Sequence, residues 1–327
     1  MRTITRRAVT GAAISVVFLP VIGLTPAGAQ TYPDRPVKVV LPFGPGGIAD
    51  VTMRLVAGKL SERMGQQFVI ENKPGPGGIN AAMTVKTAAP DGYAMLLNGN
   101  GSAISASLFK QLPYDIVKDF TPVSVLAQFD MILATRSDSE ISSVQKLLDA
   151  AKATPNKLNF GTVAAGSTQN LSAEIFKAMT GLDVAVVPFR TSPDLVTALM
   201  RGDVHVGFDF LAAFAPALSD KTIRMIASGG EKRSPLTPDV PTVVESGIAD
   251  YVVTSWNGVS VPVGTPQPII AKLNQEISAV LAQTDVKERF TQLGMEVAGS
   301  TPEGMEKRMA ADIPRWRGII MKLGLQK

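Results

Sequence analysis

Short apolar runs alternate with segments of helical periodicity over residues 37–124. The runs have the length and β-branched content of buried strands, and in the segments between them apolar residues recur every three or four positions. The predicted strands cover 37–43, 67–72 and 93–99, and the predicted helices cover 48–64 and 79–89. The expected buried stripe of the first helix is Val51, Leu55, Leu60 and Met64. This β-loop-α repeat predicts an α/β fold with a parallel sheet and a ligand at the carboxyl ends of its strands.

The same alternation returns between about residues 130 and 252. Helices are predicted near 143–153, 170–179 and 195–202, and strands at 158–162, 184–189 and 204–210. The third helix opens on Ser192-Pro193-Asp194, an N-cap serine followed by a proline and an acidic residue. Two further helices end the chain, one capped by Thr265-Pro266 and running to about Gln283, the other capped by Thr301-Pro302 and running to about Leu323.

Two long apolar runs, 121–136 and 251–262, flank the second region. We expect them to be strands that leave the first region and return to it. The sequence therefore predicts two Rossmann-like lobes joined by two crossing strands. The first lobe is expected over 30–127 plus 254–327, and the second over 128–253.

Residues 1–29 have the composition of a secretory signal peptide. Three arginines precede an uncharged stretch with the apolar segment "AAISVVFLPVIGL", and Ala27-Gly28-Ala29 forms an A-x-A cleavage site. The pair Arg6-Arg7 leaves export by the twin-arginine route open, and an uncleaved membrane anchor is the alternative to cleavage. We expect cleavage after Ala29 and a periplasmic location.

The remaining composition excludes several classes of protein. Removing residues 1–29 lowers the number of basic residues from 32 to 29, against 28 acidic residues, and no run of lysine and arginine remains to suggest a nucleic-acid partner. The chain has no cysteine, which excludes disulfides, iron–sulfur clusters, thiolate zinc sites and a lipid attached to cysteine. We expect no metal and no cofactor.

Most enzyme motifs are absent. The single histidine, His205, lies on a predicted strand and is expected to be structural, and one imidazole without cysteine is a poor basis for a zinc site. The segment 258–262, "GVSVP", lacks the last glycine of the G-x-S-x-G nucleophile motif, and the chain has no P-loop motif.

An exported NAD(P)-dependent oxidoreductase remains an alternative. Gly44, Gly46 and Ala49 fit the relaxed spacing G-x-G-x-x-A, and Glu71 ends the next strand, where a ribose-binding acid would lie. Pro45 argues against this interpretation, because a proline removes one amide donor from the turn that would face a pyrophosphate.

The sequence GPGG occurs at 44–47 and again at 75–78, each time between a predicted strand and a predicted helix. Such turns leave backbone amides free at the positive end of a helix, which suits a carboxylate as well as a phosphate. Glycine is also used in turns simply because it permits positive φ. Two copies on neighbouring strands favour an anion-binding site.

Hydrogen-bond donors also gather in the second region, in the loop before the helix at 170–179. They are Thr162, Ser167, Thr168 and Asn170. We expect one of them to be a plain helix cap. Arg190 follows a strand at the predicted rim of the cleft, where a guanidinium is able to clamp a carboxylate. Asp50 and Asp209 are equally well explained as an acid in a first helical turn and an acid at a strand end.

These stretches together resemble one family, the extracytoplasmic receptors of the tripartite tricarboxylate transporters, also called the Bug family. The segments that carry the resemblance include "YPDRPVKVVLPFGPGGIAD", "VIENKPGPGG", "AAPDGYAMLL", "GSTQNLSAEIF", "RGDVHVGFD" and "SWNGVSVPVGTP". The resemblance implies a two-lobed periplasmic binding protein, type II-like, that closes around a small organic carboxylate and is not an enzyme. It implies a large and a small membrane permease subunit as partners, with a role in signalling as the alternative to transport. We expect a monomer.

The resemblance also implies positions for the ligand contacts. In the first lobe they are Phe43, Gly44, Gly46, Gly47, Ile48, Ala49 and Asp50, with Asn98 and Ser102 nearby. In the second lobe they are Thr162, Ser167, Thr168, Asn170 and Arg190, with Asp209 nearby. The family commonly has histidine where this chain has Asn170, and Tyr-Lys-Gly where it has Phe189-Arg190-Thr191. We therefore expect an atypical ligand, and infer that Arg190 admits one with a second anionic group.

Overall fold

The computed structural model describes Thr3 and residues 32–326, and residues 33–326 form one compact unit. Apart from Thr3, the predicted signal peptide lies outside the described residues. The strands of the described part are β1 (Val37–Leu41), β2 (Phe68–Asn72), β3 (Ala94–Gly99), β4 (Phe120–Arg136), β5 (Asn159–Val163), β6 (Ala185–Phe189), β7 (Val206–Phe210), β8 (Ile223–Ser228), β9 (Thr254–Pro262) and β10 (Glu296–Val297). Its helices are α1 (Ile48–Met64), the 3₁₀ turn η1 (Pro76–Gly78), α2 (Ile79–Lys86), α3 (Asn100–Leu108), α4 (Val144–Ala153), α5 (Thr168–Thr180), α6 (Ser192–Arg201), α7 (Leu211–Ser219), α8 (Gln267–Leu281), α9 (Thr284–Gln292) and α10 (Pro302–Lys322).

The strands form a mixed sheet in the order β2-β1-β3-β9-β4-β7-β5-β6, with β8 and β10 also paired to β4. The predicted parallel pairing is confirmed at both ends of this order, because β1 is parallel to β2 and β3, and β5 is parallel to β6 and β7. The middle is antiparallel, where β9 pairs with β3 and β4, and β4 pairs with β7. Both parallel groups therefore point the carboxyl ends of their strands toward loops that are able to share one ligand.

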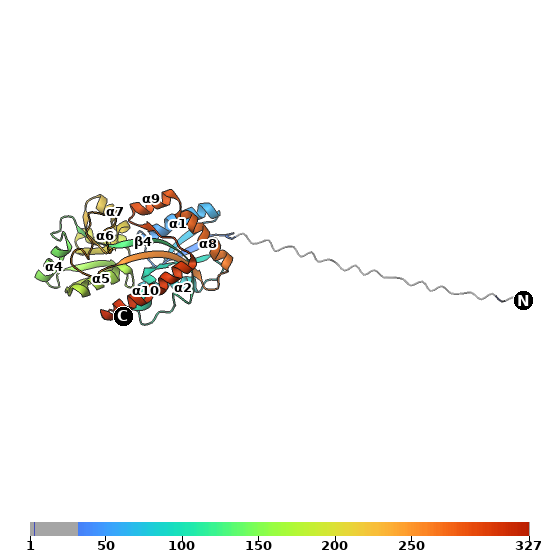
Figure 1. The fold of residues 1–327 in the computed structure, drawn as a ribbon, viewed down its shortest axis with the longest axis horizontal. Coiled ribbons are helices and arrows are strands. Elements are labelled where there is room, and N and C mark those ends of the chain that lie inside the picture. The colour runs from blue at the N-terminus through green and yellow to red at the C-terminus, as the bar shows by residue number, and fades with distance from the viewer. Residues whose placement is uncertain (1–2, 4–31, 327) are drawn as a thin grey trace. The chain divides into compact units, whose positions relative to one another are not determined.

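Strand β4 joins the two halves of the molecule. Its residues 120–130 pair with β9, whereas residues 131–136 pair with β7 and β8. The second crossing lies beside it, since Met131 N donates to Val253 O just before β9 begins. In Figure 1, β4 runs between α4, α5, α6 and α7 at one end and α1 and α8 at the other. The predicted two-lobed fold with crossing strands is confirmed. The change of partner along β4 falls between residues 130 and 131, and the lobe boundary after residue 127 stays a prediction.

The predicted buried stripe of α1 is wrong except for Leu60. The face that packs inward carries Ala49, Met53, Val56 and Leu60, while Val51, Leu55 and Met64 are only half-buried. Helix α1 has apolar residues on more than one face, so periodicity alone does not identify the buried one. Full burial of a side chain such as Met53 or Leu60 contributes about 1.5–3 kcal/mol to folding.

Helix ends differ from the predictions at three places. Helix α6 is capped by Thr191 rather than Ser192, because the Thr191 hydroxyl accepts from Asp194 N. Thr265 does not cap α8, since its hydroxyl donates to Pro262 O, and α8 ends at Leu281 before a separate helix α9. The predicted cap at Thr301 is confirmed, with its hydroxyl accepting from Gly304 N. Helices α3, α7 and α9 and strands β8 and β10 are not predicted by the sequence patterns.

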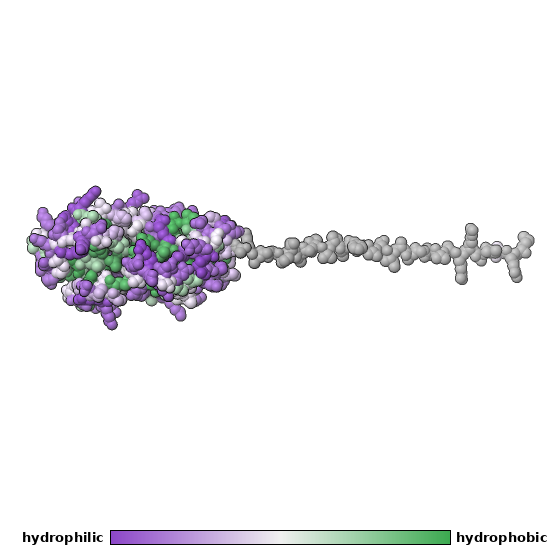
Figure 2. Space-filling view, turned by 90° about the horizontal axis from the view of Figure 1, so that it is seen from above, coloured by the Kyte–Doolittle hydropathy of each residue, from purple (hydrophilic) through white to green (hydrophobic). Residues whose placement is uncertain are grey.

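The surface of the described unit is mostly hydrophilic. Figure 2 shows hydrophilic residues over much of the visible face, with smaller hydrophobic areas among them. The most exposed large apolar side chains are Met321, at 65%, and Val263, at 57%. Among the described residues, none of the helices has both the length and the apolar character needed to span a bilayer.

Candidate functional site

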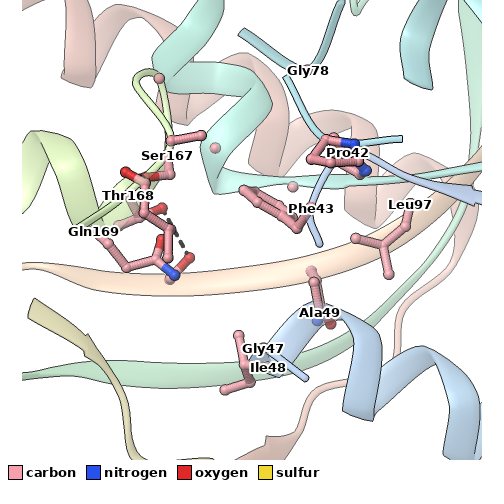
Figure 3. Close-up of a pocket in the computed structure, with 18 of the residues that line it drawn as sticks. Pro42, Phe43, Gly47, Ile48, Ala49, Gly78, Leu97, Ser167, Thr168 and Gln169 are labelled. Atoms are coloured by element: carbon pink, nitrogen blue, oxygen red, sulfur yellow. Dashed lines mark hydrogen bonds between the residues drawn. The ribbon is translucent and has the colours of Figure 1, made fainter. Parts of the chain in front are cut away.

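A cavity of about 60 Å³ lies where elements from both halves of the molecule meet. Its walls include the loop after β1, the end of β3 and the segment that leads into α5. In Figure 3, Ser167, Thr168 and Gln169 lie on one side of this space, and Phe43, Ile48 and Ala49 lie on the other. The carboxyl ends of the parallel strands therefore converge on one site, as the sequence predicts.

Helices α1, α3, α5 and α6 begin at this cavity. The lining residues at their starts are Gly47, Ile48 and Ala49 for α1, Gly99, Gly101 and Ser102 for α3, Ser167, Thr168 and Gln169 for α5, and Thr191 and Ser192 for α6. The first amide groups of a helix have no acceptor within the helix, and its dipole makes this end positive. Helix starts that converge from both halves are suited to hold an anion without a matching lysine or arginine.

Side-chain caps use some of the donors at these helix starts. The Ser167 hydroxyl accepts from Asn170 N at 3.1 Å, and the Thr191 hydroxyl accepts from Asp194 N at 3.2 Å. The prediction that one of the four donors before α5 is a plain cap is confirmed, and that residue is Ser167.

Apolar side chains form much of the remaining wall. Phe43, Leu97, Val163, Phe129 and Phe210 line the cavity, and the rings of Phe129 and Phe210 pack edge to face with centroids 4.5 Å apart. Phe129 comes from the crossing strand β4 and Phe210 from the end of β7. Such a wall suits the hydrocarbon body of a small organic acid.

Charged groups are sparse at the site. Among the described residues that line the cavity, Arg190 is the only one with an ionisable side chain, and it is exposed. Asp209 lies fully buried behind the wall, where its Oδ1 accepts from Gln169 Nε2 at 2.9 Å and from Phe210 N at 2.8 Å. Burial raises the pKa of Asp209, while hydrogen bonds from Ser192, Gln169 and Phe210 act in the opposite direction.

Asp50 shapes the loop after β1. Its Oδ2 accepts from Gly46 N at 3.0 Å and from Arg54 Nε at 2.9 Å, and its Oδ1 accepts from Asn72 Nδ2 at 3.0 Å. The same Asn72 amide donates to Phe43 O. Although burial by itself raises the pKa of Asp50, the hydrogen bonds from Arg54, Gly46 and Asn72 hold it below its ordinary value. Asp50 is therefore ionised at neutral pH and fixes the loop from behind.

The two halves touch across the cavity. Asn100 Nδ2 donates to Thr168 Oγ1 at 3.0 Å, Ser105 Oγ donates to Gly166 O at 3.2 Å, and Gly77 N donates to Ala165 O at 3.2 Å. These contacts correct one expectation about the GPGG turns. The amide of Gly46 donates to Asp50 Oδ2 and that of Gly77 donates to Ala165 O, so these two amides already have acceptors within the protein.

The structure places ten of the predicted site residues on the cavity wall. They are Phe43, Gly44, Gly47, Ile48, Ala49, Asn98, Ser102, Ser167, Thr168 and Arg190. The residues set back from the wall are Gly46, Asp50, Thr162, Asn170 and Asp209. Asn170 Nδ2 donates to Thr162 Oγ1 at 3.3 Å, so this pair packs behind the start of α5. Direct ligand contact by any of these residues stays a prediction.

Sequence reasoning missed the contribution of β9 and of two phenylalanines. Ser255, Trp256 and Asn257 line the cavity, as do Phe129 and Phe210. The polar residues within the apolar run "YVVTSWNGVSVP" were the available signal, but a strand gives them no fixed face until its neighbours are known.

The residues on which enzyme interpretations rested are engaged elsewhere. Glu71 forms ion pairs with Lys38 at 3.0 Å and with Lys73 at 3.1 Å. His205 Nδ1 lies 2.7 Å from Asn159 Oδ1 and outside the cavity wall. Within the described part of the chain, no three histidine or acidic side chains cluster closely enough to hold a metal ion.

Comparison with known proteins identifies close relatives over nearly the whole described chain. A family model described as "Tripartite tricarboxylate transporter family receptor" matches residues 52–325. The protein BugT of Bordetella pertussis is 31% identical over 315 residues, which cover 95% of this chain and 97% of BugT.

Solved structures of similar proteins share the fold. Rpa4515 of R. palustris, solved with adipate, is 35% identical with a TM-score of 0.86 and covers 90% of this chain and 98% of its own. MatC from Rhodopseudomonas palustris, solved with bound malate, is 32% identical with a TM-score of 0.83 and covers 88% of this chain and all of its own.

Proposed function

Because this chain belongs to the tripartite tricarboxylate transporter receptor family, we propose that it captures a small carboxylate between its lobes and delivers it to a membrane transporter. The observation that carries the proposal is the convergence of the starts of α1, α3, α5 and α6, from both lobes, on one cavity. Rpa4515 with adipate and MatC with malate are structures of carboxylate-binding relatives.

The proposed mechanism is recognition without a chemical step. A ligand held by α1 and α3 on one side and by α5 and α6 on the other binds the closed arrangement better than an open one. That difference in affinity drives closure, with β4 and the segment before β9 as the hinge. The closed form is then the one presented to the transporter.

The receptors of this family are periplasmic. We infer that residues 1–29 direct export and are removed after Ala29, and that the partners are a large and a small permease subunit. A single chain provides both sides of the cavity, which supports a monomeric receptor.

A thermal-shift screen tests this function. The exported protein is refolded to strip ligand and is then heated with mono-, di- and tricarboxylates, phosphate, NAD and NADP. A ligand at about one hundred times its dissociation constant adds about 2.7 kcal/mol to the free energy of unfolding and raises the midpoint. A rise with one class of carboxylates supports the receptor role. A rise with NAD or NADP and none with carboxylates overturns it in favour of an oxidoreductase.

A further inference from the structure

The side-chain amide of Asn257 is buried without a partner. Asn257 is only 4% exposed, and neither its Nδ2 nor its Oδ1 has a hydrogen-bond partner among the described residues. Buried polar groups are nearly always paired, and a donor or acceptor left unpaired loses the free energy of its hydration. Two such atoms on one side chain call for an explanation.

The strand places this amide at the cavity. Side chains alternate between the two faces of a strand. On β9, Trp256 points toward α10, since its Nε1 donates to Asp312 Oδ2 at 2.6 Å. Ser255 and Asn257 therefore share the opposite face, where Ser255 Oγ lies 3.2 Å from Thr168 Oγ1, and both residues line the cavity.

Each of the other amide side chains nearby has at least one hydrogen-bond partner, although Asn98 Oδ1 is also buried without one. Asn98 Nδ2 donates to Ser260 Oγ at 2.9 Å, and Gln169 Nε2 donates to Asp209. Asn100 uses both ends of its amide, because its Oδ1 accepts from Trp316 Nε1 at 2.7 Å while its Nδ2 donates to Thr168. Of the amide side chains on the described cavity wall, Asn257 is the one with both polar atoms unpartnered.

The chemistry of an amide restricts what satisfies it. Asn257 offers a donor at Nδ2 and an acceptor at Oδ1, whereas an ionised carboxylate only accepts and would leave Oδ1 unpaired. A hydroxyl or a carboxamide both donates and accepts. Resting on the receptor function proposed above, we infer that Asn257 is a specificity-determining residue and that the ligand is a carboxylate that also carries a hydroxyl or carboxamide group.

Matched ligands test this assignment by calorimetry on the refolded exported protein. Each dicarboxylate of four to six carbons is compared with its 2-hydroxy derivative and its mono-amide, beginning with succinate, malate and succinamate. A site that hydrogen-bonds a substrate group rejects the analogue that lacks it. In at least one chain length we expect the hydroxy or amide compound to bind about tenfold more tightly than the plain dicarboxylate, which corresponds to about 1.4 kcal/mol.

Substitutions distinguish the contribution of Asn257 to the ligand preference from that of the other site residues. Asn257→Leu keeps the size of the side chain and removes both polar atoms, and Asn257→Ala serves as the second variant in case leucine prevents folding. Either is expected to abolish the tenfold preference while still binding the plain dicarboxylate. The control Asn274→Leu makes the same exchange on α8, where the Asn274 amide donates to Val123 O and Ser300 O outside the cavity wall, and should keep the preference.

The outcomes distinguish this inference from the function on which it rests. If plain dicarboxylates bind as tightly as their hydroxy and amide forms, or if Asn257→Leu and Asn257→Ala keep the preference, the role of Asn257 is wrong and the receptor function stands. If the wild-type protein binds none of the carboxylates, the proposed function itself fails.

Discussion

Asn100 at the start of α3 donates a hydrogen bond from Nδ2 to Oγ1 of Thr168 at the start of α5, at 3.0 Å. The bond joins the two groups of parallel strands, because it links the helix that follows β3 to the helix that follows β5. Thr168 also lies 3.2 Å from Ser255 Oγ on β9. This hydroxyl is therefore a latch between the two halves of the molecule.

The variant Thr168→Val tests the latch. Valine keeps the shape of threonine but leaves Ser255 Oγ without this partner and Asn100 Nδ2 with only its 3.5 Å bond to Thr254 O, which costs about 1–3 kcal/mol in the closed form. We expect carboxylate affinity to fall by about 5- to 150-fold by calorimetry. The control Thr180→Val, at the other end of α5, should bind normally. An affinity for Thr168→Val within twofold of wild type would show that the latch does not contribute.

Gly44→Ala tests how closely the loop after β1 approaches the other lobe. A Cβ at Gly44 would lie 2.5 Å from Thr191 Cγ2, too close for two carbon atoms. Overpacking of this kind costs about 1–3 kcal/mol in the closed arrangement, and opening of the lobes relieves it. We expect a weaker affinity with little change in the melting temperature of the ligand-free protein.

The second substitution Thr191→Ser removes Cγ2 and keeps the capping hydroxyl. We expect the double variant Gly44→Ala, Thr191→Ser to recover most of the lost affinity. Failure of this rescue would mean that Gly44 is required for another reason, such as direct contact of its backbone with the ligand.

Asp50→Ala tests whether a residue behind the cavity positions the loop. Removing the carboxylate leaves Gly46 N and Asn72 Nδ2 without this acceptor. We expect the free energy of unfolding to fall by about 1–3 kcal/mol and ligand affinity to fall with it. Asp285→Ala breaks an exposed ion pair with Lys59 and should cost less than about 1 kcal/mol. If Asp50→Ala and Asp285→Ala changed the free energy of unfolding and the ligand affinity equally, Asp50 would not position the loop.

Arg190→Ala tests the one ionisable side chain among the described residues of the cavity wall. Because Arg190 is exposed, its interaction with an anion is worth about 1 kcal/mol or less, and affinity for a dicarboxylate should fall by up to about fivefold. Monocarboxylates should be affected less. The control Arg201→Ala, at the far end of α6, should change neither. Unchanged dicarboxylate affinity in Arg190→Ala would refute a second anionic group at this position.

Asp130→Asn tests a titrating group on the crossing strand. Burial, with a smaller contribution from Glu296, raises the pKa of Asp130 from 3.8 to about 6. Between about pH 4 and pH 6 the folded protein keeps a proton that the unfolded chain has released, so the free energy of unfolding falls as pH rises through this window. Above about pH 6 the free energy of unfolding has fallen by its full amount, about 3 kcal/mol or less.

We therefore expect Asp130→Asn to be more stable than wild type at pH 7.5 and equal to it near pH 4, as measured by denaturation at several pH values. The exposed control Asp149→Asn should follow wild type throughout. A constant difference between Asp130→Asn and wild type at all pH values would contradict the raised pKa.

Sequence patterns predicted the elements that repeat. The strand, glycine turn and helix around Gly44 appear in the structure as β1, its loop and α1, because each step is encoded by neighbouring residues. The loop from Thr162 to Asn170 likewise leads into α5. Together with the family resemblance, local signals of this kind located ten residues of the cavity wall.

The features that the sequence patterns did not predict depend on packing between residues that are distant in sequence. The buried face of α1 follows Met53 and Val56 rather than Val51 and Leu55, since the neighbours that select a face are distant in sequence. Asn257 belongs to the cavity because β9 returns between β3 and β4 with a particular register, with Gly99 and Ala127 as its neighbours. Asp209 was expected near the ligand, but its position on β7 buries its carboxylate behind Gln169, which donates to it.

Small-angle scattering of the exported protein, with and without the carboxylate that gives the largest thermal shift, tests the central claim most directly. If the ligand is enclosed between two lobes that close on β4, its addition must shrink the radius of gyration of the refolded, ligand-free protein. The closed profile should also match the one calculated for residues 33–326. A carboxylate that binds tightly while the scattering profile stays unchanged would contradict capture by closure.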